Sequence, residues 1–419
     1  MTTQNDMFEN QFSNRIDEYS NVPKIVMGVH AIDGLSGLAM ELAENKSVLL
    51  VTDKHLENIG SLVQSKTSLE DAGFAVDTYS TEASEPGIEE ARRIINTARK
   101  GKYGLLIGIG GGSIMDVTKI AAVMANTPGE LEEYLCPSEK PLRKAKPKIM
   151  IPTTSGTGSE CSNFAVVIAK DERIGPVKTW IAGEAVLADS AIIDPALTIS
   201  LPPRETARCG MDALSHVAEA VLSLKANPIS DALALKAVEL IFHNLKTACR
   251  KGTDVNARWQ MSLAATIGGI VITYPWIAGP ALIGHVASEG ISALYGASHG
   301  ETCGVLLPYV FWYNSPHQYA RKKITNIVEV MGNEVATCEQ KDAVKHTITN
   351  TFDLLEEIGM PTSLKELGIL EKDIPMLSEY ILKRAEEMYS MAEYNPVRAT
   401  KENIEEFFSK AVRGRDSIE

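Results

Sequence analysis

The sequence lacks two features that would tie it to nucleic acid or to a membrane. Its 41 Lys and Arg residues are outnumbered by 54 Asp and Glu residues, giving a formal net charge of −13. It therefore has no basic surplus with which to neutralise phosphates or anionic lipid headgroups. Its most apolar stretches, such as Ala278 to Ile283, are interrupted by Gly and Pro and fall short of the ~20 residues of a membrane helix. We expect neither partner.

Cysteine is also scarce. The six cysteines are widely spaced and form no C-x-x-C pair, so the sequence indicates neither a disulfide scaffold nor a zinc ribbon, and we expect reduced thiols in a cytoplasmic protein. Residues 1–22 are polar and acidic, and we interpret them as an extension rather than a targeting signal. The remaining composition, 44% hydrophobic and 23% charged, is typical of a globular chain long enough for two domains.

The first half of the chain alternates between strand-like runs and segments of helical periodicity. This alternation predicts βαβ units and a parallel sheet. The strand-like runs cover 47–53, 73–80, 103–110, 148–154, 163–169 and 191–195. From Leu201 onward almost every segment has helical spacing. We therefore expect an α/β domain over 23–200 and an all-helical domain over 201–419.

Three segments that follow predicted strands indicate a dinucleotide crevice. GIGGGS (108–113) opens a helix, where backbone N–H groups can hold a phosphate. It departs from G-x-G-x-x-G and follows the third predicted strand, which disfavours a standard Rossmann domain, and a tight turn requiring positive φ is the alternative. Asp53 ends an earlier strand, where a carboxylate can bind ribose hydroxyls or cap a helix. PTTSGTGSE (152–160) adds hydroxyls after another strand.

The helical half contains a candidate metal site. Asp212 and His216 are four residues apart, so on a helix they share one face and could both be ligands, although a local hydrogen bond is the more common outcome. His285 and His299 follow later in the chain. One carboxylate and three imidazoles suit Fe²⁺ or Zn²⁺ and leave room for a substrate oxygen. We expect packing or surface roles for the other histidines of this half, His243, His317 and His346.

Seven motifs together resemble the iron-dependent (group III) alcohol dehydrogenases. They are GIGGGSIMD (108–116), IPTTSGTGSE (151–160), AIIDPALTISLPP (191–203), GMDALSHVAEA (210–220), HVASEG (285–290), SHGETCGVLLPYV (298–310) and NPVRATKENI (395–404). The resemblance covers nearly the whole chain after about residue 22. It implies an α/β N-terminal dinucleotide-binding domain with a parallel sheet and an all-α C-terminal metal-binding domain, the two-domain architecture of dehydroquinate synthase.

The resemblance also implies roles for individual residues. The implied metal ligands are Asp212, His216, His285 and His299. The implied cofactor contacts are Asp53, which favours NAD; Gly111, Gly112, Ser113 and Asp116 at the pyrophosphate; Thr153, Thr154 and Thr157 beside the nicotinamide half; and Lys178.

The chain departs from the family's pattern on the substrate side. Family members often have a second histidine four residues after the third ligand, where this chain has Glu289. The segment 273–285 before it is also atypical, and Phe164 stands at a position expected to line the substrate pocket. These differences leave the identity of the substrate open.

We therefore expect a cytoplasmic oxidoreductase that transfers a hydride between NAD(H) and a small alcohol, aldehyde or ketone. Fe²⁺, or another divalent metal such as Zn²⁺, would polarise the substrate oxygen. Glu289, one helical turn after His285, is a candidate to relay the released proton. A homo-oligomer, a dimer or larger, is the default expectation.

Two other classes of enzyme compete with this interpretation. Residues 296–300 match the G-x-S-x-G nucleophile elbow around Ser298, with Asp342 and His346 downstream, but the elbow requires a preceding strand and this segment lies in the helical half. The second alternative is a non-redox enzyme of the same two-domain plan that reduces its bound NAD only transiently. Net production of NADH would argue against it.

Overall fold

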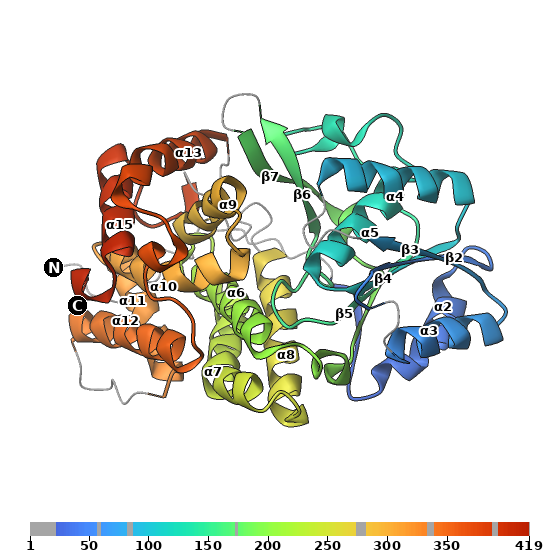
Figure 1. Cartoon of the computed structure of the whole chain (residues 1–419), viewed down its shortest axis with the longest axis horizontal. Helices are drawn as coiled ribbons and strands as arrows, with labels where there is room; N and C mark the ends of the chain where they lie inside the picture. The colour runs from blue at the N-terminus through green and yellow to red at the C-terminus, as the bar shows by residue number, and fades with distance from the viewer. Residues whose placement is uncertain are drawn as a thin grey trace.

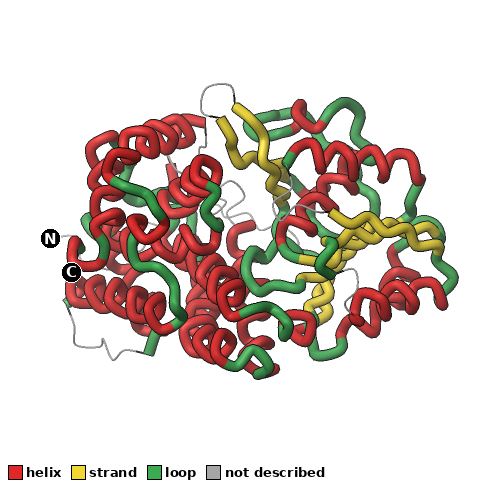
Figure 2. Tube along the Cα trace, viewed as in Figure 1, coloured by secondary structure: helices red, strands yellow, loops and turns green. Residues whose placement is uncertain are grey.

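The computed structural model describes residues 22–56, 60–81, 87–171, 175–273, 282–332, 339–387 and 393–418. The predicted extension, apart from Val22, and residues 274–281 of the atypical segment before His285 lie outside this part of the chain. Within it, all strands lie between Lys24 and Ile193, and the regular elements that follow are helices (Figure 1, Figure 2).

Six parallel strands form the main sheet, in the spatial order β1-β8-β5-β4-β2-β3. They are β1 (Lys24–Met27), β2 (Ser47–Asp53), β3 (Ala75–Thr81), β4 (Leu105–Gly110), β5 (Lys148–Pro152) and β8 (Ser190–Ile193). Strands β4 and β5 are buried along their whole length, as parallel strands covered on both faces should be. The short edge strand β1 was not predicted from the sequence, and the glycine run therefore follows the fourth strand of the chain and not the third.

Helices cover both faces of this sheet. Val48 and Leu50 of β2 face one side and pack with α2 (Leu35–Leu42) and α3 (Gly60–Asp71). Leu49 and Val51 face the other side and pack with α4 (Ile88–Gly101) and α5 (Gly112–Met124). The alternation of side chains along a strand therefore supplies two separate cores from a single apolar run.

An antiparallel hairpin lies outside the main sheet, toward the helical half (Figure 1). It consists of β6 (Phe164–Asp171), which the sequence predicts, and β7 (Gly175–Ala182), which it does not. Strand β6 contacts α5, and β7 contacts α9 (Ile283–Tyr295) of the helical half. The hairpin therefore bridges the two halves of the molecule.

The helical half is assembled around α6 (Pro203–Leu222), which is buried almost without interruption from Thr206 to Leu222. A helix that is buried on every side lies at the centre of its domain. Around it pack α7 (Pro228–Arg250), α8 (Val255–Thr273), α9, α10 (His299–Asn314), α11 (Gln318–Val330), α12 (Gln340–Glu357), α13 (Ile374–Glu387) and α15 (Lys401–Arg413). No helix in the described residues is long and apolar enough to cross a membrane.

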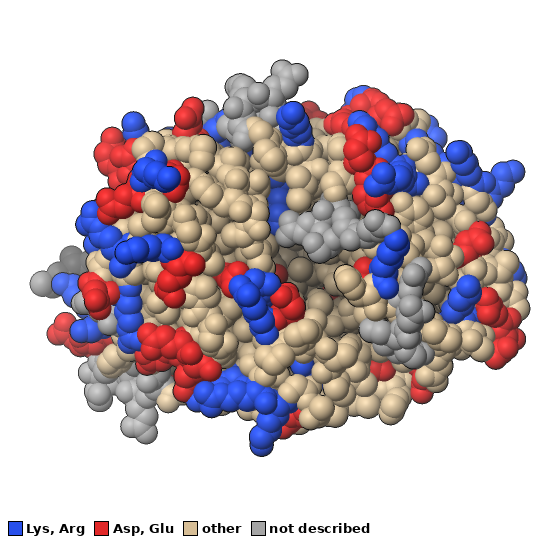
Figure 3. Space-filling view, viewed as in Figure 1, with Lys and Arg blue, Asp and Glu red and all other residues tan. Residues whose placement is uncertain are grey.

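The distribution of charged side chains on the surface agrees with the acidic net charge of the chain. On the face shown in Figure 3, acidic and basic side chains are interspersed and form no broad basic patch. The same face is hollowed near its centre, between the α/β half and the helical half (Figure 3).

The loop after β5 meets α8 through two glycines. Gly158 has a φ of 64°, and a Cβ at this position would lie 2.4 Å from the Gly269 nitrogen. In return, a Cβ on Gly269 would lie 2.0 Å from the Gly158 carbonyl oxygen. Only two glycines permit this contact between backbones. It fixes the 152–160 loop of the α/β half against the helical half.

Replacing Gly269 by alanine tests this contact. We expect Gly269→Ala to reduce stability by about 1–3 kcal/mol, the usual cost of overpacking, and to lower the melting temperature followed by circular dichroism. Gly268→Ala is the matched control, because its Cβ would lie 3.7 Å from Val217 Cγ1 and alanine is favoured over glycine in a helix by about 1 kcal/mol. Equal melting temperatures for the two variants would contradict the account.

Candidate active site

Three helices bring the four predicted metal ligands together. Asp212 and His216 lie on α6, His285 on α9, and His299 is the first residue of α10. Asp212 Oδ1 lies 4.0 Å from His216 Nε2 and 3.8 Å from His299 Nε2. The His216 ring stacks on the His285 ring with centroids 4.6 Å apart, and the His299 ring meets His285 edge-on at 5.7 Å.

Three polar atoms of this cluster are buried without hydrogen-bond partners among the described residues: Asp212 Oδ1, His285 Nε2 and His216 Nδ1. His216 faces Asp212 with its other ring nitrogen, Nε2, so Asp212 Oδ1 and His285 Nε2 are the two considered as metal donors. Leaving a buried polar atom unpaired costs about 1–3 kcal/mol, and a shared cation would satisfy both atoms.

Burial lowers the pKa of His216 to about 4 and the pKa of His299 well below its usual value. Both imidazoles are therefore neutral near pH 7, which is the form that binds metal. Burial lowers the pKa of His285, but the charges of Cys303 and Glu219 outweigh burial and raise that pKa well above its usual value, so a cation at this site would replace a proton on His285. One carboxylate and three imidazoles are a donor set that fits a divalent ion.

Two of the imidazoles are held by buried partners on their other ring nitrogen. His285 Nδ1 lies 3.0 Å from Glu219 Oε1, and His299 Nδ1 lies 2.9 Å from Ser288 Oγ. A carboxylate in this position favours the Nδ1–H tautomer and leaves Nε2 free to bind metal. Neither partner was predicted from the sequence. Glu219 could have been found, because it follows Asp212 by seven residues on the same face of α6.

A thiol joins the cluster, and the sequence analysis did not single it out. The donor atoms of Asp212, His285, His299 and Cys303 all lie within 4.8 Å of one another. His216 lies against this compact set but is not a member of it. The missed signal was spacing: His299 and Cys303 are four residues apart on α10, the same separation that indicated Asp212 and His216.

The predicted cofactor segments lie at the carboxyl ends of three neighbouring strands, as the sequence analysis expects. In the sheet β4 lies between β2 and β5. The parallel register pairs Val51 with Gly108 and Ile109 with Ile151. Asp53 ends β2, the glycine run leads from β4 into α5, and the 152–160 loop leaves β5. The three segments therefore meet at one edge of the sheet.

The glycine run is present for close packing and not for positive φ, so the tight-turn alternative is wrong. Gly108, Gly110, Gly111 and Gly112 are absent from the positive-φ residues, and Gly111, at φ −73°, precedes α5 as its cap. A Cβ on Gly112 would lie 2.5 Å from Thr157 Oγ1. The small residues let the amino end of α5, including Ser113, approach the next loop closely, and such an end can bind a phosphate.

The three predicted threonines surround this turn. The Thr153 N–H donates to the Gly110 carbonyl at 3.0 Å. Thr154 Cγ2 would lie 3.6 Å from a Cβ on Gly111, and Thr157 packs on Gly112. Their arrangement agrees with a loop that lies beside a bound dinucleotide, a role that stays a prediction.

Two predicted aspartates make internal hydrogen bonds. Asp53 Oδ1 accepts the Leu56 N–H at 3.0 Å within a turn, and the next helix, α3, begins only at Gly60. Asp116 accepts from Ser159 Oγ at 2.5 Å and from the Val166 N–H at 3.1 Å. Asp116 thereby ties the 152–160 loop and β6 to α5. Its direct contact with the cofactor, like that of Asp53, stays a prediction.

Lys119, which was not predicted from the sequence, supports the same loop from inside. The side chain is completely buried, 3.2 Å from Asp116 Oδ1. Its ammonium donates to the Ser159 carbonyl at 2.9 Å and to the Phe164 carbonyl at 2.6 Å. A buried ammonium with an ion pair and several acceptors holds these segments in one geometry.

The predicted substrate-side residues lie where the hairpin meets the helices. Phe164 begins β6 and packs against the hydrophobic core of the helical half. Glu289 Oε2 is buried and has no hydrogen-bond partner in the part of the chain that the structure describes. Burial raises the pKa of Glu289, and the charges of Arg384 and Lys178 oppose that effect. Lys178 also lowers the pKa of His299, so the Lys178 charge lies close to the metal cluster.

Arg384 was not predicted to belong to this region. It lies on α13 and donates from Nη2 to the Lys178 carbonyl at 2.9 Å. Its guanidinium also lies 5.9 Å from the centroid of the Trp180 ring on β7. This side chain therefore ties the last part of the chain to the hairpin, close to Glu289.

The nucleophile elbow lacks the strand that it requires. Ser298 follows α9, which ends at Tyr295, and precedes the first residue of α10. Its neighbour His299 belongs to the metal cluster. Asp342 and His346 lie on α12. The motif is thus a helix–helix junction and gives no support to a serine hydrolase.

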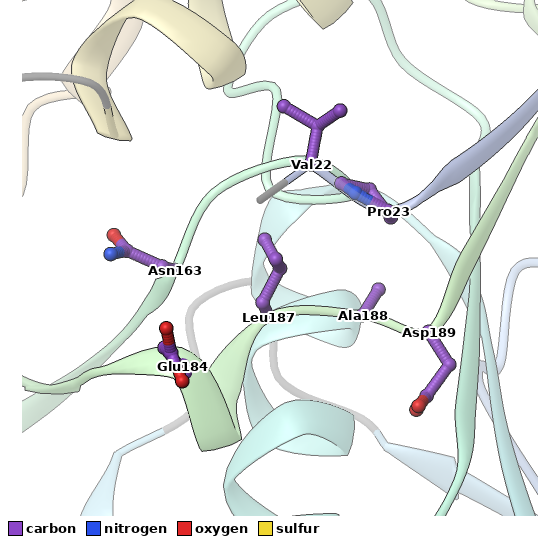
Figure 4. A pocket seen from close by; sticks show the side chains of 7 residues that line it. All are labelled: Val22, Pro23, Asn163, Glu184, Leu187, Ala188 and Asp189. Carbon is purple, nitrogen blue, oxygen red and sulfur yellow. The ribbon is translucent and has the colours of Figure 1, made fainter. Parts of the chain in front are cut away.

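A second hollow, of about 300 Å³, is drawn in Figure 4. Its lining residues are Val22, Pro23, Asn163, Glu184, Leu187, Ala188 and Asp189. Pro23 and Asp189 directly precede β1 and β8. The hollow therefore lies at the amino ends of these strands, opposite the edge where the predicted cofactor segments meet. It includes none of the predicted site residues.

Comparisons with known proteins find two family patterns that match most of the chain. The pattern described as "Iron-containing alcohol dehydrogenase" matches residues 23–195, and "Fe-containing alcohol dehydrogenase family, C-terminal" matches residues 206–412. Long-chain-alcohol dehydrogenase 1 of Geobacillus thermodenitrificans is 35% identical over 80% of this chain and 82% of its own length. The 1,3-propanediol dehydrogenase of Klebsiella pneumoniae is 31% identical, over 93% and 97% respectively.

Solved structures give the same result. A 1,3-propanediol oxidoreductase superposes with a TM-score of 0.87 at 30% identity, covering 95% of this chain and 100% of that one. The sulfoacetaldehyde reductase of Bifidobacterium kashiwanohense, solved in complex with NAD⁺, superposes with a TM-score of 0.81 at 28% identity, covering 95% and 99%.

The Glu219 contact leads to a prediction about metal affinity. We expect Glu219→Ala to weaken metal binding by about 10–100-fold, the usual cost of losing the partner that orients a ligand. Glu219→Gln should lose less, because its amide oxygen can still accept from His285 Nδ1. Competition with a chromophoric chelator measures both affinities. Glu205→Gln on the same helix, which alters only a pair with Arg208, is the control. Equal affinity in all three variants would show that Glu219 does not orient His285.

Proposed function

The chain belongs to the iron-containing alcohol dehydrogenase family, and from this premise we propose that it interconverts a small alcohol and its aldehyde or ketone at the cluster of Asp212, His216, His285 and His299. NAD-dependent and metal-dependent alcohol oxidation is the chemistry of the family. The observation that carries the assignment to these residues is the pair of buried, partnerless donor atoms, Asp212 Oδ1 and His285 Nε2.

When bound, the metal supplies a Lewis acid for the substrate oxygen, and the nicotinamide accepts or returns the hydride. The residues of this chain bind and orient both partners. The amino end of α5, at Gly111, Gly112 and Ser113, offers N–H groups to the pyrophosphate, with Asp116 holding the adjoining loop. Asp53 at the end of β2 is suited to the ribose hydroxyls of NAD.

The nicotinamide end of the cofactor would lie along the loop that contains Thr153, Thr154 and Thr157. The contact of this loop with α8, through Gly158 and Gly269, supports that arrangement, because it turns the loop toward the helical half. Lys178 would lie near the same end of the cofactor, since its charge acts on His299.

The proposal leaves open which alcohols the enzyme oxidises. Proteins similar to this chain carry the names long-chain-alcohol dehydrogenase, 1,3-propanediol dehydrogenase, choline dehydrogenase and NAD-dependent methanol dehydrogenase. Phe164 begins β6 and packs on the helical half, and Glu289 is one turn after His285 on α9. These positions support a substrate pocket in which an apolar ring and a carboxylate would contact the substrate.

We propose the remaining properties on more general grounds. Cys161, Cys209, Cys249 and Cys303 are free thiols, which supports a reducing compartment such as the cytoplasm. The two family patterns meet between residues 195 and 206, which supports domains over 23–200 and 201–419. A homo-oligomer follows only from the frequency of symmetric assemblies among enzymes.

A substrate panel tests the function. We expect net formation of NADH from NAD and at least one alcohol among short primary alcohols and diols, or its consumption with an anionic aldehyde. A chelator should abolish the reaction, and Fe²⁺ or Zn²⁺ should restore it. Absorbance of NADH is the measurement. Absence of turnover with every metal would contradict the dehydrogenase, and a reaction without net NADH would favour the non-redox alternative.

Glu289 is proposed to accept the proton released during alcohol oxidation, through water. We expect Glu289→Gln to lower kcat by up to about 100-fold, the lower end for a general base, and to remove the acidic limb of the pH–rate profile. Glu289→His should recover part of the rate with a limb shifted toward the imidazole pKa of about 6.5. An unchanged profile and turnover in Glu289→Gln would leave the carboxylate without a role in proton transfer.

A further inference from the structure

We propose that Cys303 is an additional ligand of the metal, so that the centre contains sulfur as well as oxygen and nitrogen. The inference rests on the proposed function, because it concerns the same site. It goes further in the donor set, since the ligands that the resemblance implies are Asp212, His216, His285 and His299 and do not include Cys303. On binding, the sulfur–metal bond would form and the thiol proton would leave to solvent.

The distances among the donor atoms support a shared ion. Cys303 Sγ lies 3.7 Å from His299 Nε2, and Asp212 Oδ1 lies 3.8 Å from the same nitrogen. Ligands bound at 2.0–2.3 Å around a tetrahedral ion are about 3.3–3.8 Å apart. Sulfur, nitrogen and oxygen are thus spaced as three corners of one coordination shell, before any rearrangement.

The packing of α10 on α6 fixes the thiol in this place. A Cβ on Gly300 would lie 2.3 Å from the Arg208 carbonyl oxygen, and a Cβ on Gly304 would lie 2.9 Å from Met211 Cβ. The two glycines, one turn apart on α10, let the helices approach closely on either side of Asp212. Cys303 directly precedes Gly304 and is only 2% exposed. Its side chain is therefore held beside the other donors.

The donors form two matched pairs. Asp212 and His216 are one turn apart on α6, and His299 and Cys303 are one turn apart on α10. The His285 ring on α9 stacks on the His216 ring, so α9 contributes the remaining donor of the cluster. Asp212, His285, His299 and Cys303 form the compact set of four donors, and His216 lies against it. A thiolate would also increase preference for softer ions such as Zn²⁺ and Co²⁺.

Cobalt substitution gives a direct spectroscopic test. Metal-free protein is titrated with Co²⁺ without oxygen, and the absorption spectrum is recorded. We expect visible d–d bands together with a near-ultraviolet band from thiolate-to-cobalt charge transfer. Cys303→Ser and Cys303→Ala should lose the near-ultraviolet band and keep the visible ones. Cys249→Ser, which removes another buried thiol on α7, should keep both.

The affinity for Zn²⁺ gives a second measurement. We expect Cys303→Ser to bind Zn²⁺ at least about tenfold more weakly than wild type. Losing a residue that only orients a metal ligand already lowers metal affinity by about tenfold, and the loss of a ligand should cost no less. Circular dichroism checks that each variant is folded. Should both Cys303 variants unfold, the near-ultraviolet band of wild type, retained in Cys249→Ser, still decides whether a thiolate binds.

The outcomes separate this inference from the proposed function. Visible bands without a thiolate band in wild type, or a thiolate band that persists in folded Cys303→Ser, would overturn the role of Cys303 and leave the metal site in place. The absence of any cobalt spectrum would overturn the metal site itself, and the role of Cys303 with it.

Discussion

Helices of the helical half bring together buried polar atoms that need a cation as their partner. Asp212 Oδ1 and His285 Nε2 are buried with no hydrogen-bond partner in the described part of the chain. An arrangement of this kind is unfavourable without a cation, because neither atom has recovered the interactions that it made with water. Helices α6, α9 and α10 each contribute donors to it, and Glu219 and Ser288 hold two of the imidazoles from behind. A metal ion would therefore stabilise both the site and the packing of the three helices.

The α/β half is positioned relative to this centre by a few close contacts. Gly158 and Gly269 join the 152–160 loop to α8 through their backbones. Lys119 and Asp116 fix the other side of that loop to α5 and β6. The carboxyl edge of the sheet, where a dinucleotide binds in folds of this kind, is thereby held facing the metal cluster. A hydride donor and a polarised carbonyl need this fixed alignment.

Much of this architecture could be predicted from the sequence, because local patterns carry it. The alternation of strands and helices and the spacing of Asp212 and His216 depend only on nearby residues. The edge strand β1 is too short to stand out, and β7 was missed although its partner β6 was found. Glu219, Ser288, Lys119 and Cys303 were missed because their roles depend on which helix faces converge. The glycine run was found, but one reason considered for it, positive φ, was wrong, since close packing with Thr157 depends on a loop distant in sequence.

The central claim is that one metal ion lies between α6, α9 and α10, facing the carboxyl edge of the sheet. Anomalous X-ray scattering from crystals grown with Fe²⁺ or Zn²⁺ and NAD tests it most directly. The account predicts a single strong peak within bonding distance of Asp212, His285 and His299, with the nicotinamide ring opposite. A metal bound elsewhere, or NAD bound with this cluster empty in the presence of excess metal, would contradict it.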